Sequence, residues 1–419
     1  MPAQLKSEGL TRETRRKLGA LPAASRSARA LFTLGVGALV CLLALPCATA
    51  SAASASGWSA QRLPVPSSAV VSPLSCSSST ACTVVAAYYP FPSSDNDVLL
   101  ALRWNGRGWS REFMAEPAGS STVLVSAISC PSGSWCVAVG GSTTGNPPGA
   151  YVPLVERWNG ALWSLDRVPT PARPGLSSRL TSVSCTSPTA CIAVGQSVSR
   201  NPRRPTTPLV ERWNGSTWSI QHASGGPLMS VSCASGLACT AVGATGDQGL
   251  AEGWDGGRWS IEPNPRPRPF GGPDGDNQLD SVSCASRDAC IAVGDSSWGT
   301  GLNSVRITLA EQWNGSRWSV QPTPNPIQLD QFTGVSCWSN SSCVAVGDYT
   351  NRAGTATLPL VERWRGGRWS SLRAPRSLST GRSADSTLLA VDCVAEGSCI
   401  AIGDAEGGPF SVQLPSTAP

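Results

Sequence analysis

A repeat of roughly 50 residues fills most of this 419-residue chain and constrains its fold more than any other feature. Each copy begins with two cysteines separated by five residues, as in LTSVSC followed by CIAVG. Six copies then continue with a segment like PLVERWNGSTWS, in which four residues separate two tryptophans. The cysteine pairs are Cys76/Cys82, Cys130/Cys136, Cys185/Cys191, Cys233/Cys239, Cys284/Cys290, Cys337/Cys343 and Cys393/Cys399. The tryptophan pairs are Trp104/Trp109, Trp158/Trp163, Trp213/Trp218, Trp254/Trp259, Trp313/Trp318 and Trp364/Trp369.

Four short apolar runs in each copy predict four strands, which we call a to d in chain order. In the third copy these runs are residues 182–185, 191–194, 209–213 and 218–220. Asn214-Gly215 is a strong hairpin signal because both residue types tolerate a positive φ, and the hairpin should place Trp213 opposite Trp218. Four antiparallel strands at this period are typical of one blade of a β-propeller.

The two ends of the repeat region predict how the ring closes. The seventh copy has strands a and b, and residues 410–414 can serve as strand c, but no Trp-Ser strand follows. An orphan Trp58-Ser59 lies before the first copy. We therefore expect an all-β, seven-bladed propeller over residues 51–419, a single domain whose last blade is closed by the N-terminal strand.

Residues 1–50 have the pattern of a signal peptide: a basic start, an apolar run over residues 30–45 and Ala48-Thr49-Ala50 as a cleavage site. An uncleaved anchor, or lipidation at Cys47, are alternatives. The pattern predicts a secreted, extracellular protein that meets the membrane only through this segment. The segment holds seven of the 32 basic and two of the 27 acidic residues, which leaves 25 of each. This balance argues against nucleic acid as a partner, and we expect a monomer.

The fourteen cysteines of the repeat are expected to form seven disulfides, each within one pair. An exported chain with an even number of cysteines favours disulfides, and each pair spans only one short hairpin. Structural zinc is the alternative, but the chain has a single histidine and no Cys-x2-Cys spacing within the repeat. We expect no metal and no cofactor.

Alternating strand direction should put the a–b and c–d turns on one face of the ring, which we call the repeat face. The b–c and d–a loops should lie on the other, the varied face, where function is usually found on such scaffolds. Candidate ligand-binding residues there are Arg173, Arg179, Arg200, Arg203, Arg204, Tyr151 and Trp298. Arginines bind carboxylates or phosphates and aromatic faces stack on sugars, so an acidic glycan or protein is the expected ligand. Solvated loop charge is the alternative.

Several acidic residues could serve either a functional or a structural role. The glutamates of the ERWNG-like segments recur in five copies and are expected to be scaffold, paired with the following arginine or a backbone amide: Glu156, Glu211, Glu252, Glu311 and Glu362. Residues 274–277, with Asp280 close by, fit either a polar turn or an oxygen-rich calcium loop, and the spacing of an EF-hand is absent. Asp295, Asp348 and Asp404 follow the glycine that ends strand b, at the channel mouth or in local turns.

The c–d turn resembles the Asp-box of sialidase-type BNR propellers, whose pattern is Ser-x-Asp-x-Gly-x-x-Trp. Residues 160–163 and 215–218 match its Gly-x-x-Trp end, but Trp158 and Trp213 stand at the Asp position. The match therefore supports the place of the turn and not membership. Kelch repeats are a looser parallel. The whole repeat region also resembles secreted actinobacterial proteins with SVSC…CxAVG…ERWNGxxWS repeats.

A sialidase would need an arginine triad, a Tyr–Glu pair and an acidic Asp, and no motif assigns those roles here. Copper propellers need several histidines, and this chain has one. We therefore assign no catalytic residues. The sequence favours a binding or surface-interaction module, with a glycan-acting hydrolase as the alternative.

Overall fold

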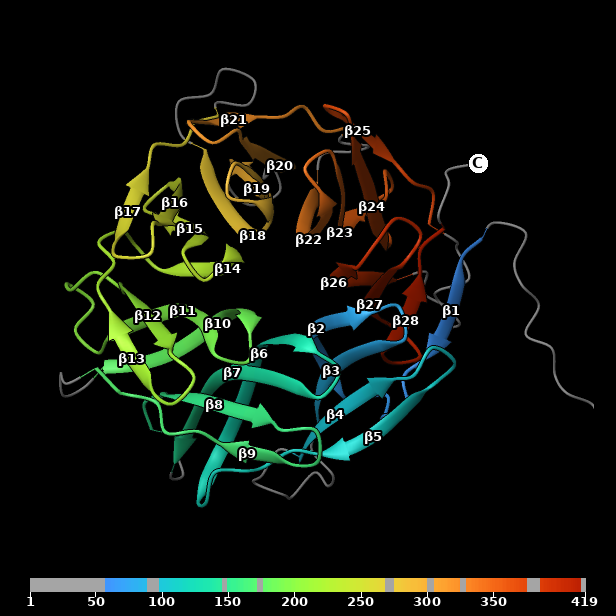
Figure 1. The fold of residues 1–419 in the computed structure, drawn as a ribbon. Coiled ribbons are helices and arrows are strands. Elements are labelled where there is room, and N and C mark those ends of the chain that lie inside the picture. Colours follow the sequence, from blue (N-terminus) through green and yellow to red (C-terminus); the bar gives the residue numbers. More distant parts are fainter. Residues whose placement is uncertain are drawn as a thin grey trace, which may run out of the picture. The chain divides into compact units, whose positions relative to one another are not determined.

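The computed structural model describes residues 57–88, 98–144, 149–171, 176–267, 275–299, 305–324, 329–374 and 385–415. They form seven four-stranded antiparallel sheets arranged as blades around a central axis (Figure 1). All of them belong to one compact unit, Ala52–Pro419. Among these residues there is no helix long and apolar enough to cross a membrane. The predicted signal peptide and its cleavage site lie outside the described residues.

Each blade runs from an inner strand a near the axis to an outer strand d (Figure 1). Blades 1 to 3 consist of β2 (Val70–Ser78), β3 (Ala81–Tyr88), β4 (Val98–Trp104), β5 (Trp109–Phe113); β6 (Ser120–Ser132), β7 (Trp135–Thr144), β8 (Val152–Trp158), β9 (Trp163–Leu165); and β10 (Leu176–Ser187), β11 (Ala190–Ser199), β12 (Thr207–Trp213), β13 (Trp218–Gln221). Blades 4 to 6 consist of β14 (Leu228–Ser235), β15 (Ala238–Thr245), β16 (Gln248–Trp254), β17 (Trp259–Glu262); β18 (Asp276–Ser286), β19 (Ala289–Trp298), β20 (Val305–Trp313), β21 (Trp318–Val320); and β22 (Asp330–Ser339), β23 (Ser342–Thr350), β24 (Thr357–Arg365), β25 (Arg368–Ser371).

Blade 7 joins the two ends of the repeat region and confirms the predicted closure (Figure 1). It consists of β26 (Ser386–Cys393), β27 (Cys399–Ala405), β28 (Phe410–Gln413) and β1 (Ser59–Arg62). β1 pairs with β28 antiparallel, with Ser59 opposite Gln413 and Arg62 opposite Phe410. Trp58 is buried in the core of this blade. Pairing of β1 supplies the fourth strand that the chain end lacks.

A β-bulge in the inner strand explains the glycine that ends the CIAVG motif. In blade 3 the register of β10 against β11 shifts between Leu180 and Ser182. Gly195 lies opposite this point, and a Cβ there would come within 2.1 Å of the Arg179 carbonyl oxygen. Only glycine allows the two backbones to approach so closely. The same close approach occurs at Gly294 against Gln278, so the bulge recurs around the ring.

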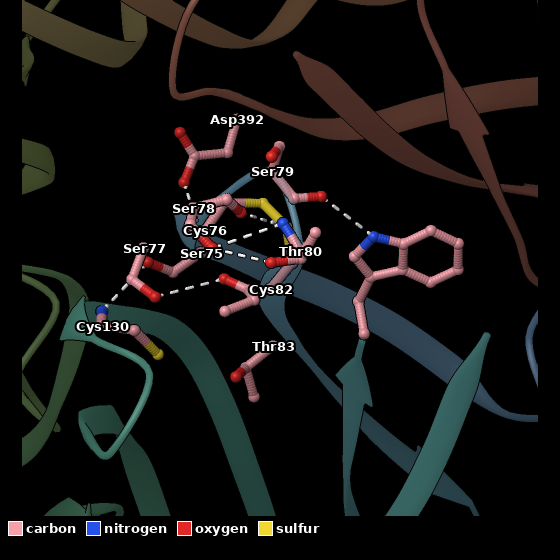
Figure 2. Close-up of a disulfide and its surroundings, with 12 residues drawn as sticks. Ser75, Cys76, Ser77, Ser78, Ser79, Thr80, Cys82, Thr83, Cys130 and Asp392 are labelled. Atoms are coloured by element: carbon pink, nitrogen blue, oxygen red, sulfur yellow. Dashed lines mark hydrogen bonds between the residues drawn. A yellow bond between two sulfur atoms is a disulfide. The ribbon is translucent and has the colours of Figure 1, made fainter. Parts of the chain in front are cut away.

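Serines of the VSC motif join the inner strands of neighbouring blades. The Ser75 side chain of blade 1 accepts a hydrogen bond from the backbone N–H of Cys130 in blade 2, at 3.0 Å (Figure 2). The same bond passes from each blade to the next through Ser129, Ser184, Ser232, Ser283 and Ser336. In blade 7 Asp392 stands at the serine position, and its Oδ2 accepts from the Cys76 N–H at 2.7 Å. The circle of seven bonds is thus closed by a carboxylate.

Disulfides and tryptophan pairs form as the sequence predicts. All seven cysteine pairs are bonded within their own a–b hairpin, as Cys76–Cys82 shows (Figure 2). Trp213 lies directly opposite Trp218, with ring centroids 5.6 Å apart. Asn214 Oδ1 accepts two backbone N–H groups of the c–d turn, and Gly215 has φ +96°. These contacts fix the local hairpins that make each blade.

The second cysteine of each pair lies in the core, at or next to the start of strand b. Cys136, bonded to Cys130, is 0% exposed, and Cys343, bonded to Cys337, is 1% exposed. Cys136 packs among the apolar side chains of blades 1 and 2, and Cys343 among those of blades 5 and 6. The sulfurs of Cys136 and Cys343 are therefore both disulfide-bonded and buried. Their role is to hold the hairpin and to fill the space between blades.

The five repeated glutamates are fully buried and structural. Glu156 accepts a hydrogen bond from the Ala115 N–H, and Glu252 accepts one from the Gly225 N–H, so each contacts the d–a linker that leads into its own blade. This confirms the predicted backbone amide for these two. The alternative, pairing with the following arginine, does not occur at Glu156: successive residues of strand c point to opposite faces, and Arg157 pairs with Asp166.

Ring closure makes a prediction about the N-terminal strand. Deleting residues 58–66 should lower the free energy of unfolding by on the order of 5 kcal/mol, because it removes buried Trp58 and leaves β28 as an unpaired edge. Replacing the exposed loop 200–206 by an Asn-Gly turn is the control and should change stability by less than about 1 kcal/mol. Equal losses in denaturant titrations of the two variants would contradict closure by β1.

The buried glutamates predict a pH dependence of stability. Burial raises the pKa of Glu211 to about 8, and its carboxyl oxygens have no hydrogen-bond partner among the described residues. Between pH 4.5 and 8 the unfolded chain is ionised at this group while the folded chain keeps its proton, so stability falls as the pH rises. Glu211→Gln should therefore be more stable than the parent at pH 8 by a few kcal/mol (about 1.4 per pKa unit at most), and equal to it near pH 4.

Chemical denaturation across this pH range measures the effect. Glu406→Gln, which removes a carboxyl at an exposed position, is the control, and its stability curve should follow that of the parent between roughly pH 5 and 8. A Glu211→Gln curve parallel to the parent curve would show that Glu211 does not titrate in this range.

Candidate functional site

A polar cavity of about 610 Å³ opens between blades 5 and 6. Its polar lining comes from strands a, b and c of blade 5 and strand a of blade 6: Gln278, Asp280, Asp295, Ser297, Arg306 and Gln331. These residues lie where strands a and c begin and strand b ends, which is the varied face. The cavity therefore lies on the face where the sequence predicts binding.

Strand pairing places the charged groups of the cavity side by side. Asp295 follows Gly294 on β19 and lies opposite Gln278 of β18, two residues before the bulge residue Asp280. Arg306 is the second residue of β20 and lies opposite Ser297. An isolated bridge between Arg306 and Leu329 links blade 5 to the start of blade 6. The β18–β19 and β19–β20 pairings and the bridge to Leu329 thus fix the backbone of the lining residues.

Side-chain hydrogen bonds orient the lining groups. The Gln278 amide donates to Asp280, and the Arg306 guanidinium donates to the side-chain oxygen of Gln331. Gln331 Nε2 donates in turn to Asp348 Oδ1 at 2.8 Å. Amide and guanidinium groups of the cavity lining are therefore held in place by hydrogen bonds to neighbouring side chains, within a concave polar site of the kind that binds small ligands.

Two carboxyls of the cavity hold their protons more tightly than usual. Burial raises the pKa of Asp280, while the Gln278 hydrogen bond and the Arg306 charge oppose the shift. Burial, together with the negative charge of Asp280, raises the pKa of Asp295 to about 6, and Arg306 opposes this as well. Below about pH 6 Asp295 keeps its proton, so it can donate as well as accept hydrogen bonds.

Asp280 also faces the central channel. A second cavity of about 250 Å³ lies in the channel, is lined by the bulged inner strands and shares Asp280 and Thr333 with the first. At the same bulge position, Thr181 and Thr333 donate to carbonyls of their own and the next blade. Asp280 replaces this hydroxyl with a carboxyl. The two cavities therefore meet at Asp280 and Thr333, which stand at the bulge positions of blades 5 and 6.

The predicted arginines lie on the varied face but are not gathered into one cluster. Arg200, Arg203 and Arg204 are exposed in the b–c loop of blade 3. Arg179 lies on β10 and Tyr151 just before β8, where both flank Gly141. Among the described residues no contact joins this pair to the three loop arginines. Arg173 lies outside the described residues.

The aromatic and acidic candidates are distributed over several blades. Trp298 ends β19 in blade 5, two blades from the arginines. Of the three aspartates expected at the channel mouth, Asp295 lines the cavity, Asp348 binds Gln331 and Asp404 is exposed on blade 7. Asp274 of the expected acidic loop lies outside the described residues. No group of three His, Cys, Asp or Glu side chains fit for a metal ion occurs in the described part of the chain.

Sequence reasoning missed Arg306 and Gln331 as site residues. Arg306 stands in a copy that departs from the PLVERW pattern, where VRITLAEQW replaces it. Gln331 lies in the next copy, two residues before the bulge residue Thr333 of β22. The only signal was this departure from the repeat, since their contact joins two different blades.

No protein-family model and no curated protein sequence matches this chain. Among solved structures, U3-55K and the WD40 repeats of RRP9 are each 11% identical with a TM-score of 0.53, covering 86% of this chain and 99% and 98% of theirs. YCF48 bound to a D1 peptide is 13% identical with a TM-score of 0.48, over 86% of this chain and 97% of that one. In fold, the chain is thus similar to WD40 and other β-propeller proteins.

Proposed function

We propose that this protein is a secreted binding module that takes a polar ligand on its varied face. The observation that carries the proposal is the cavity of about 610 Å³ between blades 5 and 6. Its hydrogen-bonding groups belong to strands, so they are held in place before a ligand arrives, which reduces the entropy lost on binding. The seven disulfides are compatible with an extracellular protein.

The chemistry of the face supports a glycan or a polar protein loop as the ligand. Arg306, Gln331 and the Asp280–Asp295 pair match hydroxyl and amide groups, which both donate and accept. Arg200, Arg203 and Arg204 add exposed positive charge on blade 3 of the same face. A ligand long enough to reach from the cavity to this loop would gain from carrying acidic groups, because arginine forks bind carboxylates bidentately.

Arrays of neutral and acidic glycans and of acidic peptides provide the test. Arg306→Gln should weaken binding of the parent's best ligand at least tenfold, because it removes a charge from the cavity. The triple change of Arg200, Arg203 and Arg204 to Ser should weaken only acidic ligands, several-fold, and reduce the salt dependence of their binding. Arg317→Ser, at an exposed position in a c–d turn of the repeat face, is the control and should leave binding unchanged.

All variants should keep the melting temperature of the parent within about 2 °C, because each site is at the surface. Parent-like binding by Arg306→Gln would place the ligand outside the cavity. No binding by the parent on either array would contradict the proposal itself.

A glycan-acting hydrolase is the second candidate, and one observation favours it. Asp280 and Asp295 line the same cavity, and the pKa of Asp295 is raised to about 6. Glycosidases work with two carboxyl groups, one of which stays protonated near neutral pH as the general acid. Asp295 has the pKa for this role, and Asp280 would act as the second carboxyl.

A panel of fluorogenic glycosides tests the hydrolase. Turnover should decline as the pH rises above about 6, where Asp295 loses its proton, and Asp295→Asn should lower kcat at least 100-fold. Asp404→Asn, an exposed aspartate on the same face, is the control and should leave turnover unchanged. Absence of turnover across the panel, with glycan binding intact, would discard the enzyme and leave the binding module.

A further inference from the structure

Arginines on strand c join successive blades on the repeat side of the ring. Arg103 of blade 1 stacks over Trp158 of blade 2, with its guanidinium carbon 5.1 Å from the ring centroid. Arg157 stacks in the same way over Trp213, and Arg212 over Trp254. Each guanidinium thus covers the first tryptophan of the next blade, a contact that cation–π attraction favours.

An acidic residue at or just after the end of strand d completes this arrangement. Asp166 pairs with Arg157 of its own blade at 3.0 Å, and its Oδ2 accepts from the Trp218 indole N–H of the next blade at 3.3 Å. The guanidinium therefore lies between an indole face and a carboxylate. In blade 1 Arg103 approaches Glu112 in the same manner, at 3.8 Å.

Blade 4 keeps the acid and the tryptophans but lacks the arginine. Gly253 stands at the arginine position, where EGWDG replaces ERWNG. Glu262 stands at the acid position and its Oε2 accepts from the Trp318 indole at 2.9 Å. Within the described residues Glu262 has no ion-pair partner, and no cation stacks over Trp313, the tryptophan that an arginine at position 253 would cover.

The missing side chain leaves a cavity of about 130 Å³ between blades 4 and 5, lined by Gly253, Glu262 and Trp313. Trp313 is only partly buried, whereas the other five tryptophans of strand c are at most 7% exposed. Asp255, Asp288 and Arg287 also line the cavity, so with Glu262 it carries three acids and one base. A gap of this size has room for one side-chain head group and not for an oligosaccharide.

We propose that this cavity binds an arginine side chain of a polypeptide partner. The guanidinium would stack on Trp313 and pair with Glu262, taking the place that Arg157 and Arg212 fill in blades 2 and 3. The site lies on the repeat face, between strands c and d of blade 4 and the a–b turn of blade 5, so it is separate from the cavity on the varied face. The proposal does not depend on the function assigned to that cavity.

The chemistry favours arginine over lysine. A planar guanidinium can lie flat on an indole and still direct two N–H groups at one carboxylate, whereas an ammonium makes only a point contact. The repeat also provides a backbone acceptor for the guanidinium. In blade 1, Arg103 donates to the carbonyl oxygen of Gly133, in the a–b turn of blade 2. The equivalent carbonyl oxygen in blade 5 is that of Arg287, which already accepts from the Trp313 indole N–H at 3.2 Å.

The test uses an acetyl-Gly-Arg-Gly amide peptide as the probe, with matched peptides carrying lysine or citrulline. Citrulline keeps the shape of arginine and removes the charge. Isothermal titration should show the arginine peptide binding the parent at least tenfold more tightly than the citrulline peptide and several-fold more tightly than the lysine peptide. Free L-arginine should bind more weakly than the peptide, which identifies a polypeptide as the source. Equal binding of the arginine and citrulline peptides would overturn the proposal.

Gly253→Arg is the decisive variant, because it supplies the missing side chain from within. It should abolish binding of the arginine peptide and raise the melting temperature. A Cβ at this position meets Glu262 Oε1 at 2.2 Å, but that atom ends a flexible side chain and can move aside. Gln312→Arg is the matched control: it adds an arginine at the same repeat position of blade 5 and leaves the cavity open, so binding should persist.

Glu262→Gln is a second variant that tests the same site if Gly253→Arg folds poorly. It should weaken the arginine peptide at least fivefold, and the loss should be smaller for the neutral citrulline peptide. Peptide binding that survives both Gly253→Arg and Glu262→Gln would overturn the proposal.

Discussion

The circle of hydrogen bonds from VSC serines to cysteine N–H groups is the constraint on which the ring depends. Inner strands of neighbouring blades belong to different sheets, so no backbone ladder joins them. Each serine hydroxyl provides this link instead, and six such bonds pass from blade to blade. Where blade 7 meets blade 1, one carboxylate oxygen of Asp392 accepts from the Cys76 N–H (Figure 2) and the other accepts from the Ser336 hydroxyl. The disulfides hold each hairpin rigid directly beside these bonds.

Strand c carries two further links, one on each of its faces. Its buried glutamate faces the preceding linker, as in Glu156 with Ala115, and its arginine faces the following blade, as in Arg157 with Trp213. A blade is therefore fastened on both sides by adjacent residues of one short motif. Because these contacts come from the repeated motif, the loops of the varied face can differ in length and composition without weakening the contacts between blades.

The fold was predictable because its main signals are local. The spacing of Cys185 and Cys191 and the Asn214-Gly215 turn determine pairing within one blade, and the unmatched Trp58-Ser59 indicated the closure. The roles of Ser184 and Arg157 were not predictable, because their partners lie in the next blade, about one repeat away in sequence. The candidate cavity was missed for the same reason: Arg306 and Gln331 meet only across two blades, and neither belongs to the repeated pattern.

The pairing of β1 with β28 has a consequence for how the molecule reaches its native state. Every other blade is made from residues close together in sequence, so each can form its hairpins early and independently. Blade 7 alone needs the first and last strands to meet, with Ser59 opposite Gln413, and these residues lie near opposite ends of the described chain. Contacts of such high order are slow to form because the intervening chain must already be compact. The β1–β28 pairing should therefore form last. A chain in which any blade is misfolded should fail to bring these two strands together.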